Sequence, residues 1–171
     1  MNCTLAHTPC DLKPRMGMQQ APASSFRREE VNVPSSWPVS RPNCILFFDG
    51  PCVLCQNSLR RLVKHERPRV DALCGELAFA PLQGKTATDL LPAAWMAEPV
   101  TEVVLCHIDG QMWTGAAAIR KLSCRLTAPW RHLLRCAPAW GYRAVAQQRH
   151  RFWSRCDVCE WSPSIAVRLL P

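Results

Sequence analysis

A pair of cysteines separated by two residues, Cys52 and Cys55, constrains this chain more than any other feature. The apolar run 44–48 just before it does not alternate with polar residues, which is typical of a strand buried on both faces. Residues 49–51 form a sharp turn, and residues 56–64 then repeat apolar side chains at helical spacing with basic residues between them. The sequence therefore predicts that both cysteines lie on the turn from a buried strand into a helix.

This position matters for the chemistry of the thiols. Unpaired backbone N–H groups and the positive end of the helix dipole stabilise a thiolate at a helix start. The two-residue spacing places both sulfur atoms on one helical turn, where a disulfide can close and reopen. We expect Cys52 to be the exposed nucleophile and Cys55, one turn further in, to be the resolving thiol. Asp49 has two interpretations, because it could orient Cys55 or relay its proton, or it could cap the helix.

Length and charge limit the classes of function. The chain has 171 residues and a formal net charge of +8, but its basic residues are scattered, so we expect a solvated basic surface and no nucleic-acid partner. No secretory signal is recognisable at the N-terminus, and no apolar run is long enough to cross a membrane. The eleven cysteines are therefore expected to be reduced thiols of a cytoplasmic protein. The segment from Arg149 to Trp153 allows weak contact with a membrane surface or an acidic partner, although a solvent-facing helix is the simpler interpretation.

The pattern along the chain predicts one folded domain between two tails. Residues 1–42 are rich in proline and polar residues and are expected to be a flexible tail, residues 43–161 form the domain, and residues 162–171 are expected to be a C-terminal tail. A second strand at 77–82 completes a βαβ unit, which makes the first two strands parallel. A third strand at 100–108 and a turn at Asp109–Gly110 predict an antiparallel return over 111–114. Helices are expected over 116–126 and 139–152.

The order strand, CxxC, helix, strand, hairpin and helix resembles the thioredoxin-like fold, an α/β fold with a small mixed sheet. In detail the chain resembles the DCC family of predicted thiol-disulfide oxidoreductases, which is named for its Asp-x-x-Cys-x-x-Cys signature. Asp49, Cys52 and Cys55 match that signature, and segments 79–83, 103–118 and 149–153 match further parts of the family pattern. The resemblance covers about residues 43–160 and implies a fold with extra C-terminal helices.

The resemblance also implies residues that contact substrate. Thioredoxin-like proteins usually carry a cis-proline before the third strand, facing the CxxC, and Pro99 is the candidate here. Gly50 and Pro51, in the turn before the cysteines, are the other candidate substrate-binding residues. The implied activity is exchange of disulfides with a protein or a small-molecule thiol or disulfide, with no cofactor. Direction of exchange, physiological partner and oligomeric state are left open by the sequence.

Two other classes of function compete with this one. A second CxxC pair, Cys156 and Cys159, would complete a set of four thiolates with Cys52 and Cys55, which is a full set of zinc ligands. We nevertheless predict no metal, because the first pair begins a helix instead of forming a tight knuckle, and we interpret Cys156 and Cys159 as accessory or incidental thiols. The third class is a non-catalytic adaptor that uses the same fold as a scaffold.

Overall fold

The structure is a computed structural model, and it describes residues 42–68, 74–92, 102–152, 156 and 160–171. Its centre is a four-stranded mixed sheet in the order β2-β1-β3-β4. The strands are β1 (Cys44–Phe48), β2 (Leu77–Pro81), β3 (Val104–His107) and β4 (Met112–Thr114). β1 pairs in parallel with β2 and antiparallel with β3, and β3 pairs antiparallel with β4. This is the strand order and direction of the thioredoxin-like fold, so the expected α/β class is confirmed.

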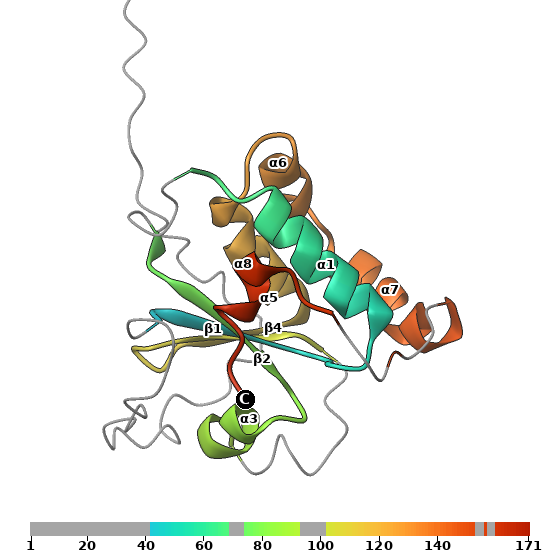
Figure 1. Cartoon of the computed structure of the whole chain (residues 1–171). Coiled ribbons are helices and arrows are strands. Elements are labelled where there is room, and N and C mark those ends of the chain that lie inside the picture. Colours follow the sequence, from blue (N-terminus) through green and yellow to red (C-terminus); the bar gives the residue numbers. More distant parts are fainter. Residues whose placement is uncertain (1–41, 69–73, 93–101, 153–155, 157–159) are drawn as a thin grey trace, which may run out of the picture.

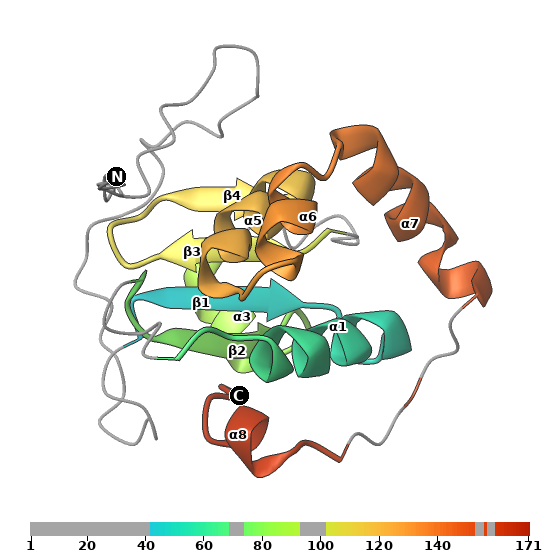
Figure 2. The ribbon, with the colours of Figure 1, turned by 90° about the horizontal axis from the view of Figure 1, so that it is seen from above.

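Helices cover the sheet unequally on its two faces. α1 (Val53–Lys64), α5 (Gly115–Leu122), α6 (Trp130–Arg135) and α8 (Pro163–Ala166) lie on one side, and α3 (Lys85–Leu90) lies on the other (Figure 1). α7 (Ala139–Phe152) lies beyond the end of the sheet at which β1 leads into α1 (Figure 2). α6 and α7 are the extra C-terminal helices that we expected, whereas α8 lies in the stretch that we expected to be a tail. α7 thereby reaches the end of the molecule that carries the CxxC.

The apolar residues form two layers because side chains of a strand alternate between its faces. Leu46 and Phe48 of β1 pack under α1 and α5, whereas Ile45 and Phe47 of the same strand belong to the layer on the α3 side. A central strand with a layer on each face carries no polar alternation, which explains the continuous apolar run in the sequence. β1 is thereby fixed in register, and with it the turn that follows.

Two expectations about helices and the C-terminus are corrected by the structure. The helix expected over 116–126 ends as an α-helix at Leu122 and continues as a short 3₁₀ turn, η2 (Ser123–Arg125). The last ten residues are not a tail: Ile165 and Leu170 are 1% exposed, and the backbone N–H of Leu170 donates to the carbonyl of Phe79 at 2.8 Å. Their apolar side chains are buried in the two layers of the core, so the domain extends to the end of the chain described here.

Other predictions fall outside the part that the structure describes. The expected tail lies there except for its last residue, and so do Pro99 and Cys159. A cis peptide bond joins Ala128 to Pro129, in the turn before α6. In the described ranges, no helix combines the length and the apolar composition that crossing a bilayer requires.

Candidate active site at the start of helix α1

Both thiols of the CxxC lie at the start of α1, as the sequence predicted. Cys52 is the N-cap residue, and Cys55 lies in the first turn. Both are free thiols, and Cys52 lies close enough to Cys55 to raise its pKa. However, Cys52 is only 2% exposed and Cys55 9% exposed, so Cys52 is not the exposed nucleophile that we expected. The two sulfurs belong instead to the core layer between the sheet and the helices.

Burial acts strongly on the Cys55 thiol. It is the main cause that raises the pKa of Cys55 to about 12, and the negative charge and hydrogen bond of Cys52 raise it further. The positive charge of Arg149 and a hydrogen bond with the Asp49 backbone act in the opposite direction on this pKa. Cys55 is therefore a protonated thiol at neutral pH.

The turn before the thiols is held by two glutamine side chains. Gln83 Oε1 accepts a hydrogen bond from the Gly50 N–H at 3.1 Å, and buried Gln56 donates from Nε2 to the Gly50 carbonyl at 2.8 Å. A Cβ at Gly50 would lie 3.2 Å from both Gln83 Oε1 and Pro81 Cβ, closer than an ordinary contact. Glycine thus lets the turn approach the segment after β2. Gly50 and Pro51 are half-buried beside the thiols, and their role in substrate binding stays a prediction.

Asp49 is buried and does not cap α1. The N-cap Cys52 makes no side-chain cap hydrogen bond, and the Asp49 carboxylate is instead bound by two side chains from distant segments. Gln83 donates from Nε2 to Oδ1 at 3.0 Å, and Arg149 of α7 forms an ion pair with Oδ2 at 3.3 Å. Removal from water makes such a pair strongly dependent on both partners. The cap interpretation is therefore wrong, and Asp49 is the link between the turn and α7.

A second side chain of α7, Tyr142, lies on the same side of the site. Its hydroxyl accepts a hydrogen bond from the N–H of Val103 at 3.1 Å. Burial raises its pKa to about 12, an effect that the Val103 bond opposes and to which the charges of Glu102 and Cys55 add. Tyr142 is thus a neutral hydroxyl that joins α7 to the segment just before β3.

The second cysteine pair is described in part. The backbone N–H of Cys156 donates to the carbonyl of Pro51 at 2.9 Å, which places Cys156 directly beside the turn that carries the CxxC. Trp161 then packs its ring against Phe48, at the end of β1, with 5.7 Å between ring centroids. The chain after α7 therefore returns along the active site, although Cys159 lies outside the described residues.

The zinc alternative gains no support from the residues that are described. In those ranges, which include Cys52, Cys55 and Cys156, no three His, Cys, Asp or Glu side chains are grouped to hold a metal ion. The hydrogen bond between the CxxC turn and Cys156 joins two backbone groups, and Cys52, Cys55 and Cys156 are not in disulfides.

Sequence reasoning missed the polar residues around the thiols. Arg149 was expected on a solvent-facing helix, yet it is 4% exposed. Gln83 and Tyr142 were not singled out, and Gln56 was placed on the helix with no role. Gln83 and Arg149 lie in segments that match the family pattern, which was the available signal. Their contact with Asp49 depends on the packing of three segments and has no local signature.

Comparisons with known proteins point to one family. The chain is 29% identical over 137 residues to YuxK, an uncharacterised protein of Bacillus subtilis, and the match covers 76% of this chain and 96% of that protein. It is 28% identical over 124 residues to a chloroplastic DCC family protein of Arabidopsis thaliana, covering 68% of each chain. No solved structure matches.

The family profile of the DCC1-like thiol-disulfide oxidoreductases matches residues 46–156. This range runs from β1 to Cys156 and includes Asp49, both thiols of the CxxC and Arg149. It spans more than half of the chain, and the described part of it has the small mixed sheet that the family resemblance implied. The chain therefore belongs to the DCC1-like thiol-disulfide oxidoreductase family.

Proposed function

We propose that the protein exchanges disulfides with a protein or small-molecule partner through Cys52 and Cys55. The observation that carries the proposal is the placement of both thiols at the start of α1, beside the buried pair of Asp49 and Arg149. The helix start favours a thiolate at Cys52, and the neutral Cys55 thiol lies close to it. Family membership supports the same reaction class.

The exchange has two balanced steps. The Cys52 thiolate attacks one sulfur of a substrate disulfide, the substrate S–S bond breaks, and the departing thiolate takes up a proton. Cys55 then loses its proton and attacks the Cys52 sulfur of the mixed disulfide, which releases the second substrate thiolate. The substrate gains two electrons, and Cys52 and Cys55 are left as a disulfide. The same steps in reverse oxidise a dithiol partner.

Arg149 has a positioning role in the second step. Its positive charge lowers the pKa of Cys55 against the stronger effect of burial, so it favours the thiolate that must form there. Asp49 holds this guanidinium in place through the 3.3 Å ion pair, and Gln83 holds the other carboxylate oxygen. The neutral amide of Gln83 donates a hydrogen bond to the Asp49 carboxylate without adding charge to the site.

Three cysteine variants test the proposal. We expect Cys52→Ser to abolish reduction of insulin and of a small aromatic disulfide, because the attacking sulfur is gone. Cys55→Ser should instead accumulate a mixed disulfide with one substrate thiol per chain, since the resolving step is lost. Cys136→Ser is the control, because Cys136 is exposed and lies on the turn after α6. Full activity of Cys52→Ser would falsify the assignment.

A further inference from the structure

A second pair of thiols lies far from the CxxC, with its two sulfur atoms close to each other. No sequence motif predicted this pair. The sulfur atoms of Cys74 and Cys124 are 3.6 Å apart, although 50 positions separate the two residues in the chain. Neither is in a disulfide and both are half-buried, so their sulfurs are within reach of small reagents. A disulfide bond is about 2.05 Å long, so closing this pair needs the sulfurs to move together by roughly 1.5 Å, within the range of a side-chain rotation.

The backbone on each side of this pair is held by arginine side chains. Arg125, which follows Cys124 and is 3% exposed, donates from Nη1 to the carbonyl of Gly75 at 2.7 Å and to that of Cys74 at 3.5 Å. Arg67, in the segment after α1, donates from Nη1 to the carbonyl of Cys124 at 3.3 Å. Arg125, from the segment of Cys124, therefore binds the backbone of the Cys74 segment, and Arg67 binds the backbone at Cys124. These hydrogen bonds fix the separation of the two cysteine segments.

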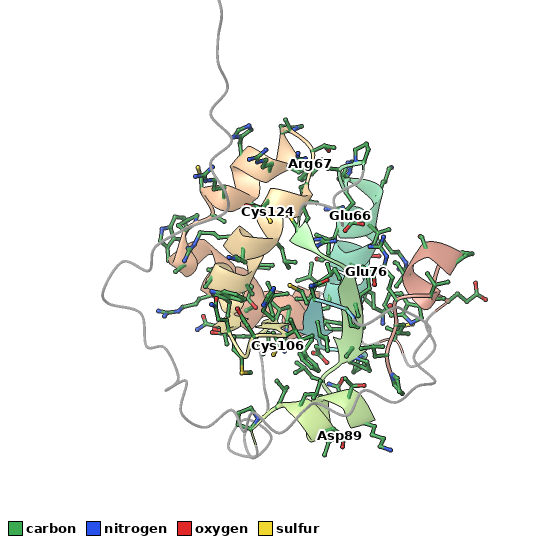
Figure 3. All side chains as sticks on the ribbon, turned by 90° about the vertical axis from the view of Figure 1, so that its left-hand side faces the viewer. Glu66, Arg67, Glu76, Asp89, Cys106 and Cys124 are labelled. Carbon is green, nitrogen blue, oxygen red and sulfur yellow. The ribbon has the colours of Figure 1, made fainter. Side chains whose placement is uncertain are left out.

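The negative charge of Glu66 holds Arg125 in place beside the two cysteine segments. Its carboxylate accepts from Nε of Arg125 at 3.1 Å and from Nη1 of Arg168 at 2.8 Å. Figure 3 shows Glu66, Arg67 and Cys124 at the same end of the molecule. Since the guanidinium of Arg125 is held from both sides, the two sulfurs are brought together by buried polar bonds and not by chance contact of surface loops. The pair is preorganised for bond formation, which lowers the cost of closing a disulfide.

This pair is separate from the proposed active site. Cys74 precedes β2 while Cys52 follows β1, and the two strands are parallel neighbours, so the pairs lie at opposite ends of these strands. The length of β1 alone is about 13 Å at roughly 3.3 Å per residue step. The Cys74–Cys124 pair therefore cannot exchange directly with Cys52 within one folded chain.

We propose that Cys74 and Cys124 are a second redox site, which closes to a reversible intrachain disulfide on reaction with a low-molecular-weight disulfide. One thiolate of the pair attacks the small disulfide, breaks its S–S bond and releases one small thiol. The other then attacks the mixed disulfide and releases the second small thiol. The pair loses two protons and two electrons, and the small disulfide is reduced to two thiols. The new bond joins the segment entering β2 to η2.

Oxidised glutathione is the probe for the test, applied to full-length Cys52→Ser/Cys55→Ser so that the CxxC takes no part. After incubation in glutathione buffers of stepped ratio, free thiols are alkylated and the protein is digested with trypsin. We expect a disulfide-linked pair of peptides, residues 70–85 joined to residues 122–125, that disappears on treatment with dithiothreitol. Cys44 and Cys106 fall in other tryptic peptides, so pairing with either is distinguished by mass.

Variants of the pair supply the controls. Cys124→Ser and Cys74→Ser should each abolish the link, whereas Cys136→Ser should keep it, and circular dichroism of the reduced variants verifies folding. Oxidation should also raise the thermal midpoint of the parent protein, because the bond closes a long loop, and it should leave that of Cys124→Ser unchanged. Single glutathione adducts without the linked peptides, or linkage of either cysteine to a different partner, would overturn the proposal.

Discussion

The carboxylate of Asp49 lies 3.3 Å from the guanidinium of Arg149, and the two side chains are 6% and 5% exposed. Asp49 belongs to the turn that carries the CxxC, whereas Arg149 lies near the end of α7. The pair therefore ties the last long helix to the thiols. Together with Tyr142, which binds the backbone at Val103, it closes the site on the side of α7.

Replacement of Arg149 tests whether this link acts on the chemistry. Arg149→Met leaves the Asp49 carboxylate buried with only Gln83, so we expect the free energy of unfolding to fall by about 3–5 kcal/mol. It also removes the charge that lowers the pKa of Cys55, so release of the second substrate thiol should slow. Urea denaturation and stopped-flow measurement of thiol release give the two quantities.

Two further variants separate stability from chemistry in that test. Asp49→Asn/Arg149→Met removes both charges and should recover much of the stability while release of the second thiol stays slow. Arg143→Met, at an exposed position of the same helix, should change neither quantity. If the double variant resolves the mixed disulfide at the normal rate, Arg149 has only a structural role.

The pH dependence of the resolving step follows from the burial of Cys55. Its pKa is raised to about 12, first by burial and then by Cys52. In the mixed disulfide Cys52 carries no charge, but burial remains, so the pKa stays above the ordinary value of 9.0. Below the pKa the thiolate fraction rises about tenfold per pH unit, so we expect the release rate of the second thiol to rise about a hundredfold from pH 7 to 9. A rate that levels off below pH 8 would contradict this prediction.

The local part of the site could be read from the sequence, and the long-range part could not. The continuous apolar run of β1, the turn and the helical spacing after it are properties of neighbouring residues, and they place Cys52 and Cys55 correctly. The exposure of Cys52 depends on what packs over α1, which no local pattern contains. Arg149 shows the same limit, because a basic residue near a helix end is solvated in most proteins, and only the fold reveals the carboxylate beneath it.

The C-terminal residues show why the structure of a short apolar segment at the end of a sequence is hard to predict. Residues 162–171 were expected as a tail, although five of the ten are apolar and two are prolines. In the structure they run alongside β2, where Phe79 pairs with Leu169 in a parallel bridge and the Thr86 N–H donates to the Pro171 carbonyl at 2.8 Å. This edge of the sheet is thereby covered, a need that only the three-dimensional arrangement makes visible.

Truncation of two buried side chains tests the contribution of this segment. Ile165→Ala and Leu170→Ala should each lower the free energy of unfolding by about 2–5 kcal/mol, because both side chains are fully enclosed in the core. Val167→Ala is the matched control, since Val167 is 56% exposed and should change the free energy by less than about 0.5 kcal/mol. Urea denaturation provides the measurement. If all three variants lose the same stability, the segment does not pack as described.

The last prediction concerns Cys156, whose contact with the active-site turn runs through its backbone. The Cys156 N–H donates to the Pro51 carbonyl, and serine preserves this bond while it removes the sulfur. We therefore expect Cys156→Ser/Cys159→Ser to keep its fold and its exchange rate with a small aromatic disulfide. Cys156→Pro removes the N–H donor and should alter the rate by freeing the turn before Cys52.

Three measurements on these variants give distinct answers about the second cysteine pair. A retained fold with slowed exchange in the serine double variant would show that its sulfurs relay electrons to Cys52 and Cys55. Stoichiometric zinc in the parent protein, lost together with the fold in that variant, would favour the metal site instead. An unchanged rate with serine and a changed rate with proline would mean that Cys156 acts through its peptide N–H. We expect this last outcome, because the described contact between Cys156 and Pro51 joins two backbone groups and involves no sulfur.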